Sequence, residues 1–115
     1  MEKFIITGGK ALKGEINVSG AKNSVLALMP ATLLNNGENI ITNTPELNDV
    51  YTLKKLMQSL GSQIEFTNNT LKINNANINN YVAPYELVKK MRASVYVLGP
   101  LLAKYGYAKV SLPGG

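Results

Sequence analysis

The first half of the chain starts with strand-like and helix-like patterns of apolar and polar positions. Residues 4–7 are mostly apolar and residues 15–19 alternate, which predicts two short strands. A segment that is apolar on nearly all sides then predicts a helix over residues 21–34, buried by neighbours around it. Ser19 or Gly20 is expected to cap the start of this helix.

The end of this helix is marked by residues with special backbone preferences. Pro30 lies inside the helix and is expected to kink it. Asn36 and Gly37 are expected to end it through a left-handed residue. The β-branched run that follows predicts a strand over residues 40–42.

The middle of the chain predicts an amphipathic helix followed by a hairpin. Leucine and methionine recur at spacings of three and four from about Asn48, and Gly61 is the expected stop. Two strand patterns, over residues 63–67 and 70–73, flank residues 68–69. Because both of these turn residues are asparagine, a tight hairpin turn is expected there.

The last third of the chain predicts a helical region and a final strand. The helical pattern runs from Pro84 to about Tyr105 and is expected to break near Met91. Residues 107–112 then predict a strand that leads into Pro-Gly-Gly.

The pattern of the first helix and strand recurs 70 positions further along the chain. The matched residues are Lys22, Ser24, Val25, Leu28 and Pro30 in the first copy, and Arg92, Ser94, Val95, Leu98 and Pro100 in the second. This favours an internal repeat of the order helix, strand, helix, strand, strand. The second copy is incomplete in this chain, and repeat architectures close their core with several units.

The two cations that open the repeats are candidate anion-binding residues. A lysine at a helix N-terminus is unfavourable by about 0.3 to 1 kcal/mol, unless an anionic ligand reverses the sign. Lys22 is expected at such a position, and a simple solvated lysine is an equal alternative for this stretch. If the repeats stack with their helix starts on one side, Lys22 and Arg92 face one anion-binding region.

Composition narrows the chemistry that the chain can perform. Its 115 residues carry a net charge of +5, but contain one arginine, no cysteine and no histidine. Thiolate or imidazole metal sites and serine–histidine nucleophiles are therefore excluded within this segment. The scattered lysines do not favour nucleic-acid binding. No apolar run is long enough to span a membrane, and the first residues lack a signal-peptide pattern, so a cytoplasmic location is expected.

Several motifs together resemble one family across essentially the whole chain. They are Gly14-Glu15, Ser19-Gly20-Ala21-Lys22-Asn23, Ala83-Pro84-Tyr85, Met91-Arg92-Ala93-Ser94, Leu98-Gly99-Pro100-Leu101 and Ser111-Leu112-Pro113-Gly114-Gly115. In this order and spacing they resemble the N-terminal part of the UDP-N-acetylglucosamine 1-carboxyvinyltransferases. The related enzymes that act on shikimate 3-phosphate are less similar, because they have a Pro-Gly-Ser-Lys-Ser type of motif around the lysine.

The resemblance implies an α+β fold of repeated βαβαββ units, arranged as the inside-out barrel of enolpyruvyl transferases and incomplete in this chain. It assigns residues 1–20 to strands of the second lobe. Residues 21–115 would form one complete unit of the first lobe and the start of a second. Substrates would bind in the cleft between the lobes, so the remainder of the same polypeptide is an expected partner.

The resemblance also implies a reaction and its residues. The enolpyruvyl group of phosphoenolpyruvate passes to the 3-hydroxyl of UDP-N-acetylglucosamine, phosphate leaves, and no metal or organic cofactor takes part. Lys22 and Asn23 resemble the phosphoenolpyruvate contacts and Arg92 resembles a nucleotide-sugar contact, whereas Tyr96 either lines the cleft or only packs. The proton donor, cysteine or aspartate in the family, is expected just after Gly115, so this segment alone is expected to be inactive.

Two other readings stay open on the residues alone. One is an enzyme of the type that acts on shikimate 3-phosphate. The other is a non-catalytic module that binds anions or a partner protein. A reading frame that continues past the Gly115 codon favours the transferase, and a stop codon there favours the module.

Overall fold

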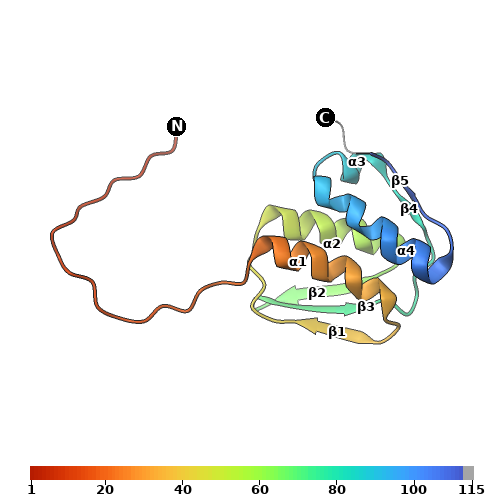
Figure 1. The fold of residues 1–115 in the computed structure, drawn as a ribbon, viewed down its shortest axis with the longest axis horizontal. Coiled ribbons are helices and arrows are strands. Elements are labelled where there is room, and N and C mark those ends of the chain that lie inside the picture. The colour runs from red at the N-terminus through yellow and green to blue at the C-terminus, as the bar shows by residue number, and fades with distance from the viewer. Residues whose placement is uncertain (113–115) are drawn as a thin grey trace.

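The computed structural model describes residues 1–112, and Figure 1 shows an extended segment followed by a layered α/β body. Residues 1–21 contain no helix or strand, so the strands expected at residues 4–7 and 15–19 are wrong for this chain. Their side chains are exposed, as for Phe4 at 97%. A strand needs a neighbour for its backbone hydrogen bonds, and this segment runs away from the body. Assigning residues 1–20 to a second lobe stays a prediction.

A three-stranded antiparallel sheet and two helices form the lower layers of the body. The sheet has the order β1 (Glu38–Ile41), β3 (Thr70–Asn74), β2 (Gln63–Thr67). Helices α1 (Lys22–Ala31) and α2 (Asn48–Leu60) lie side by side on one face of this sheet (Figure 1). The order α1, β1, α2, β2, β3 is the repeat unit that the sequence predicts.

A further layer lies over the two helices. It contains the short helix α3 (Tyr85–Val88), the 3-10 helix η2 (Arg92–Val97), and α4 (Leu98–Tyr105). The two-residue strands β4 (Val82–Ala83) and β5 (Lys109–Val110) pair in parallel at its side. The predicted helix from Pro84 to Tyr105 is therefore three pieces, and the predicted strand over residues 107–112 is shorter.

Three predicted boundaries of the body agree with the structure. Gly61 ends α2 with φ +113°, and Asn68 and Asn69 form the hairpin turn with φ +51° and +56°. Positive φ at both central residues is the mark of a type I′ turn. Met91 has extended angles, φ −157° and ψ 121°, which break the helical region where the sequence predicts the break.

The ends of α1 differ from the prediction. Its N-cap is Ala21, whose side chain cannot cap, and no side-chain cap hydrogen bond forms, so capping by Ser19 or Gly20 is wrong. After Pro30 the helix tightens into the 3-10 turn η1 (Thr32–Leu34). The left-handed end at residues 36–37 is also wrong, because the chain leaves η1 through an extended residue with φ −111°.

Apolar burial is confined to one side of α1. The core joins both helical layers to the sheet, and its members are Val25, Leu26, Met29, Leu33, Val50, Leu53, Leu56, Met57, Leu60, Leu71, Ile73, Ala83, Val88, Met91, Val97 and Leu101. Leu28 remains 51% exposed, so the prediction that α1 is buried all round is wrong for this chain.

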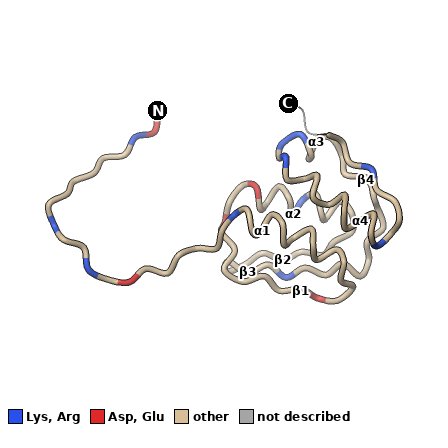
Figure 2. Tube along the Cα trace, in the orientation of Figure 1, with Lys and Arg blue, Asp and Glu red and all other residues tan. Residues whose placement is uncertain are grey.

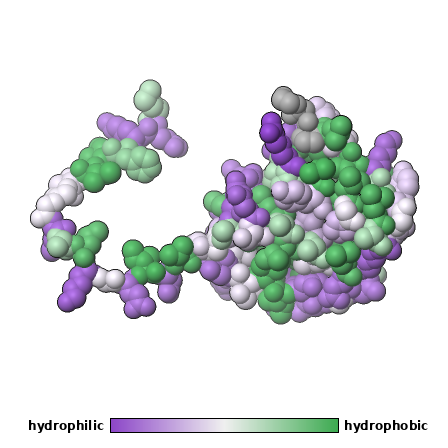
Figure 3. All heavy atoms as spheres, viewed as in Figure 1, coloured by the Kyte–Doolittle hydropathy of each residue, from purple (hydrophilic) through white to green (hydrophobic). Residues whose placement is uncertain are grey.

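Figure 3 shows further apolar side chains on the surface over α4. Leu102 of α4 is one of the exposed apolar residues, at 46% exposure.

Candidate functional site

Lys22 is the first residue of α1, at the helix end where the backbone N–H groups have no intrahelical acceptor. Its Nζ lies 2.9 Å from Oδ2 of Asp49, which belongs to the first turn of α2. Helices α1 and α2 start at the same end of their layer (Figure 1), which brings the two residues together. The Lys22 side chain is 44% exposed, so an ion pair and access from solvent coexist.

The chain that enters α1 is held by the corner after β1. The Gly20 N–H donates to the carbonyl oxygen of Asn43 at 3.1 Å, and Asn43 Nδ2 donates to the carbonyl oxygen of Val18 at 3.3 Å. A Cβ at position 20 would overlap the Asn43 carbonyl oxygen. Asn43 itself has φ +52°, a region that asparagine tolerates better than most residues. Glycine at position 20 therefore allows the close approach that places the start of α1.

Asn23 is the second residue of α1 and is exposed. Within residues 1–112 its side-chain amide has no hydrogen-bond partner. Amide donors, the first N–H groups of a helix and a lysine ammonium are groups that bind small anions. This arrangement suits a phosphate or a carboxylate.

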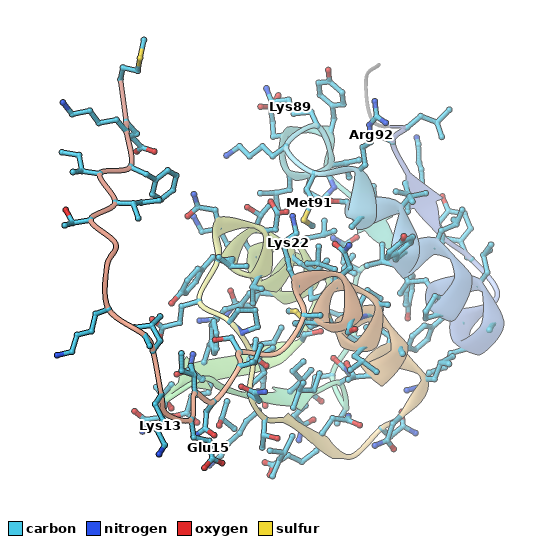
Figure 4. The ribbon with its side chains drawn as sticks, turned by 60° about the vertical axis from the view of Figure 1, so that its left-hand side comes forward. Lys13, Glu15, Lys22, Lys89, Met91 and Arg92 are labelled. Carbon is cyan, nitrogen blue, oxygen red and sulfur yellow. The ribbon has the colours of Figure 1, made fainter. Side chains whose placement is uncertain are left out.

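Arg92 is exposed and is the first residue of η2, directly after the extended Met91. Helices α1 and η2 pack against each other. Figure 4 shows Lys22 and Arg92 on the same side of the molecule, and Met91 lies between them in this view. The structure thus brings the two helical starts to one side but records no contact between the two side chains.

Basic residues lie close in sequence to the start of η2, at positions 89 and 90. Figure 2 shows basic residues beside α3 and at the start of α1. Lys89 is paired with Glu86 at 2.6 Å. The hydrogen bond and the positive charge of Lys89 hold the pKa of Glu86 below its ordinary value, and the same pairing raises the pKa of Lys89. In the described part of the chain, Arg92 forms no ion pair.

Other features of the described residues do not add to this site. A hollow beside the edge strand β1 is lined by Leu28, Thr32 and Ile40 among others, and by none of the predicted site residues. Tyr96 lies on η2 and is 52% exposed, so core packing is not its role within residues 1–112. Over the same range, no group of three or more acidic, cysteine or histidine side chains could hold a metal ion. No helix in residues 1–112 is long and apolar enough to cross a membrane.

The fold resembles part of a known class of enzyme. The crystal structure of the enolpyruvyl transferase NikO from Streptomyces tendae matches 88% of this chain and 24% of that chain, with a TM-score of 0.75 and 23% identity. The body described above is therefore a partial enolpyruvyl transferase fold, which confirms the predicted fold class. A sequence model of the family EPSP synthase (3-phosphoshikimate 1-carboxyvinyltransferase) matches residues 6–115. The chain belongs to this family of carboxyvinyl transferases.

Curated relatives agree over the full length of the chain. A protein of Chloroherpeton thalassium is 56% identical over 116 residues, and one of Rickettsia akari is 59% identical over 119 residues. Both are named UDP-N-acetylglucosamine 1-carboxyvinyltransferase, which confirms the resemblance found in the sequence motifs. The chain spans 27% and 28% of the length of these two relatives.

Sequence reasoning missed two residues that shape the site, Asp49 and Asn43. An acidic residue in the first turn of a helix is common because it suits the helix dipole, so nothing marked Asp49 as the partner of Lys22. The sequence suggests Gly20 as a possible cap and as part of the family motif, but it does not show the tight approach to Asn43 that requires glycine. Both contacts join segments that are distant in sequence, and no local pattern encodes them.

Proposed function

We propose that this chain is part of a transferase that moves the enolpyruvyl group of phosphoenolpyruvate to the 3-hydroxyl of UDP-N-acetylglucosamine. The products would be phosphate and the enolpyruvyl nucleotide sugar that feeds peptidoglycan synthesis. The names of the relatives support UDP-N-acetylglucosamine as the acceptor and a carboxyvinyl group as the group transferred. The observation that carries the proposal is the exposed start of α1, where Lys22 and Asn23 are the first two residues and no side chain caps the first N–H groups.

In this proposal Lys22 and Asn23 bind phosphoenolpyruvate. The sugar oxygen adds to C2 of phosphoenolpyruvate while a proton is delivered to the methylene carbon. A proton is then removed from that carbon as the C–O bond to phosphate breaks, which restores the double bond and releases phosphate. Lys22 would neutralise charge on the phosphate during both steps, a task in which fixed donors and charges are most effective.

Arg92 would bind the nucleotide sugar. Its planar guanidinium can donate two parallel hydrogen bonds to a diphosphate, which a lysine cannot do. Its place at the start of η2, on the side of the molecule that carries Lys22, suits a second substrate next to the first. A cytoplasmic site of action, where both metabolites occur, is part of the same proposal.

The proton donor and the opposite wall of the cleft would come from the remainder of the polypeptide. Residues 1–18 expose apolar side chains such as Phe4, Ile16 and Val18, which suit pairing with further chain. We therefore expect residues 1–115 alone to bind substrates weakly and not to catalyse. Intact-mass spectrometry of the natural protein tests whether further polypeptide is present, because the chain itself weighs 12.4 kDa. A mass of 12.4 kDa would instead support the non-catalytic binding module.

The test of the reaction compares two acceptors with the full-length polypeptide that contains this chain. Phosphate release from phosphoenolpyruvate is measured with UDP-N-acetylglucosamine and, separately, with shikimate 3-phosphate. The proposal expects release with the nucleotide sugar only. The family description names the second acceptor, so release with shikimate 3-phosphate alone would establish that alternative and contradict the proposal.

Two substitutions in the same polypeptide test the assigned residues. Lys22→Ala should lower kcat/KM for phosphoenolpyruvate by about 10²- to 10³-fold, the usual loss for a removed charge-stabilising group. Arg92→Ala should mainly raise the KM for the nucleotide sugar. Lys72→Ala is the matched control, because Lys72 is an exposed lysine on β3 between two buried residues and so points away from the helices. Wild-type kinetics in either test variant would remove that residue from the site.

A further inference from the structure

The ion pair between Lys22 and Asp49 is a tertiary contact. The other ion pair of the described residues, Lys89 with Glu86, lies within a single helical turn and forms from local geometry. Lys22 and Asp49 belong to the first turns of two different helices, so their pair exists only because α1 and α2 pack with their starts at the same end. The position of the Lys22 ammonium is thus set from α2.

The ion pair between Lys22 and Asp49 contributes little to the stability of the fold. Both side chains are more than a third exposed, at 44% and 36%, and exposed ion pairs contribute little. Asp49 already lies at the favourable end of its own helix dipole, whereas Lys22 lies at the unfavourable end of α1. A neighbouring carboxylate offsets the charge of a lysine that is needed there for another purpose.

We propose that Asp49 is a positioning residue that holds the Lys22 ammonium at the start of α1, ready for phosphoenolpyruvate. This inference rests on the proposed function. The pair restricts a long, flexible side chain to one direction before the substrate arrives. The same carboxylate repels the substrate anion and therefore weakens its binding.

These two effects of Asp49 act on different kinetic constants, so removing its charge should change both kcat and KM. Removing the charge frees Lys22, so the ammonium is misplaced in the transition state and kcat falls. Removing the charge also ends the repulsion, so the KM for phosphoenolpyruvate falls as well. If the Asp49 carboxylate only stabilised α2, removing its charge would change neither kcat nor KM once both are normalised to the amount of folded protein.

The experiment uses the full-length polypeptide with Asp49→Asn, which keeps the size of the side chain and removes its charge. We expect kcat to fall about tenfold and the KM for phosphoenolpyruvate to fall about threefold, normalised to the folded fraction. Asp49→Glu retains a carboxylate within reach of Lys22, so kcat should stay within about threefold of wild type. Glu86→Gln removes the other ion pair and is the matched control, with wild-type kinetics expected.

A second measurement reports on Lys22 without using the reaction. Lys22 is acetylated under single-hit conditions and quantified by peptide mass spectrometry, with Lys72 as an internal reference. An amine held by a carboxylate reacts more slowly, so Asp49→Asn should raise the rate at Lys22 about threefold and leave Lys72 unchanged.

Three results would overturn the inference. They are an unchanged Lys22 labelling rate, wild-type kcat and KM in Asp49→Asn, or a lower kcat with unchanged KM and a lowered melting temperature. If the wild-type polypeptide transfers no enolpyruvyl group, the proposed function fails by itself. The labelling result then still decides whether Asp49 holds Lys22.

Discussion

Replacing Gly20 by alanine tests how the start of α1 is placed. A Cβ at this position would overlap the carbonyl oxygen of Asn43 and lie 3.3 Å from its carbonyl carbon. Both obstacles are backbone atoms, which cannot turn aside as a side chain can. The segment before α1 must therefore move away from the corner after β1 by on the order of 1 Å, the scale at which a misplaced catalytic group loses much of its effect.

The cost to stability follows from the contacts that this movement breaks. They are the Gly20 N–H bond to Asn43 at 3.1 Å and the Asn43 Nδ2 bond to Val18 at 3.3 Å. Each hydrogen bond contributes about 0.5 to 1.5 kcal/mol net. Because these groups are close to solvent, water replaces part of the loss, and we expect a decrease of about 1 kcal/mol in the free energy of unfolding. The core below is untouched.

Function should suffer more than stability. A displacement of about 1 Å at the Lys22 backbone should lower kcat/KM for phosphoenolpyruvate by up to about 10²-fold. Steady-state kinetics and thermal unfolding of the full-length polypeptide measure the two effects. Gly99→Ala is the matched control, because a Cβ there has open space and alanine favours a helix. Wild-type kcat/KM in Gly20→Ala would refute the link between this close approach and the site.

Two further predictions concern single positions outside the site. Gly61→Ala should lower the free energy of unfolding by about 2 to 4 kcal/mol in urea titrations, because Gly61 has φ +113° and its Cβ would lie 2.5 Å from the Asn77 carbonyl oxygen. The control Gly37→Ala has neither problem, and an equal effect of both would contradict this account. The pKa of the Glu86 carboxyl should lie below its ordinary value in an NMR titration, and Lys89→Met should raise it. The small stabilisation by this pair is present above that ordinary value and is lost as the pH falls through the lowered pKa, so a midpoint unaffected by Lys89→Met would disprove the pairing.

Local patterns predicted most elements of the body correctly. The spacing of apolar residues placed α2, Gly61 supplied its left-handed end, and the two asparagines at residues 68–69 supplied the hairpin turn. Lys22 and Arg92 lie at helical starts as predicted. These features depend on φ, ψ and side-chain periodicity within a few residues, which the sequence alone specifies.

The strands predicted at residues 4–7 and 15–19 failed for a physical reason. An apolar or alternating pattern indicates which face of a strand is buried, but the strand itself forms only beside a partner. The described chain offers no partner there, and the segment stays extended. The same reasoning explains the exposed Leu28, because helix periodicity does not say how many neighbours a helix has.

The sequence by itself determined α2 with its end at Gly61, the hairpin turn at residues 68–69, the family and the two cations that open the repeats. Only the tertiary structure decided that Asp49 holds Lys22 and that Gly20 passes against Asn43. These contacts depend on how α1, α2 and the end of β1 pack together. Packing is set by the shapes of whole surfaces, which no short stretch of sequence contains.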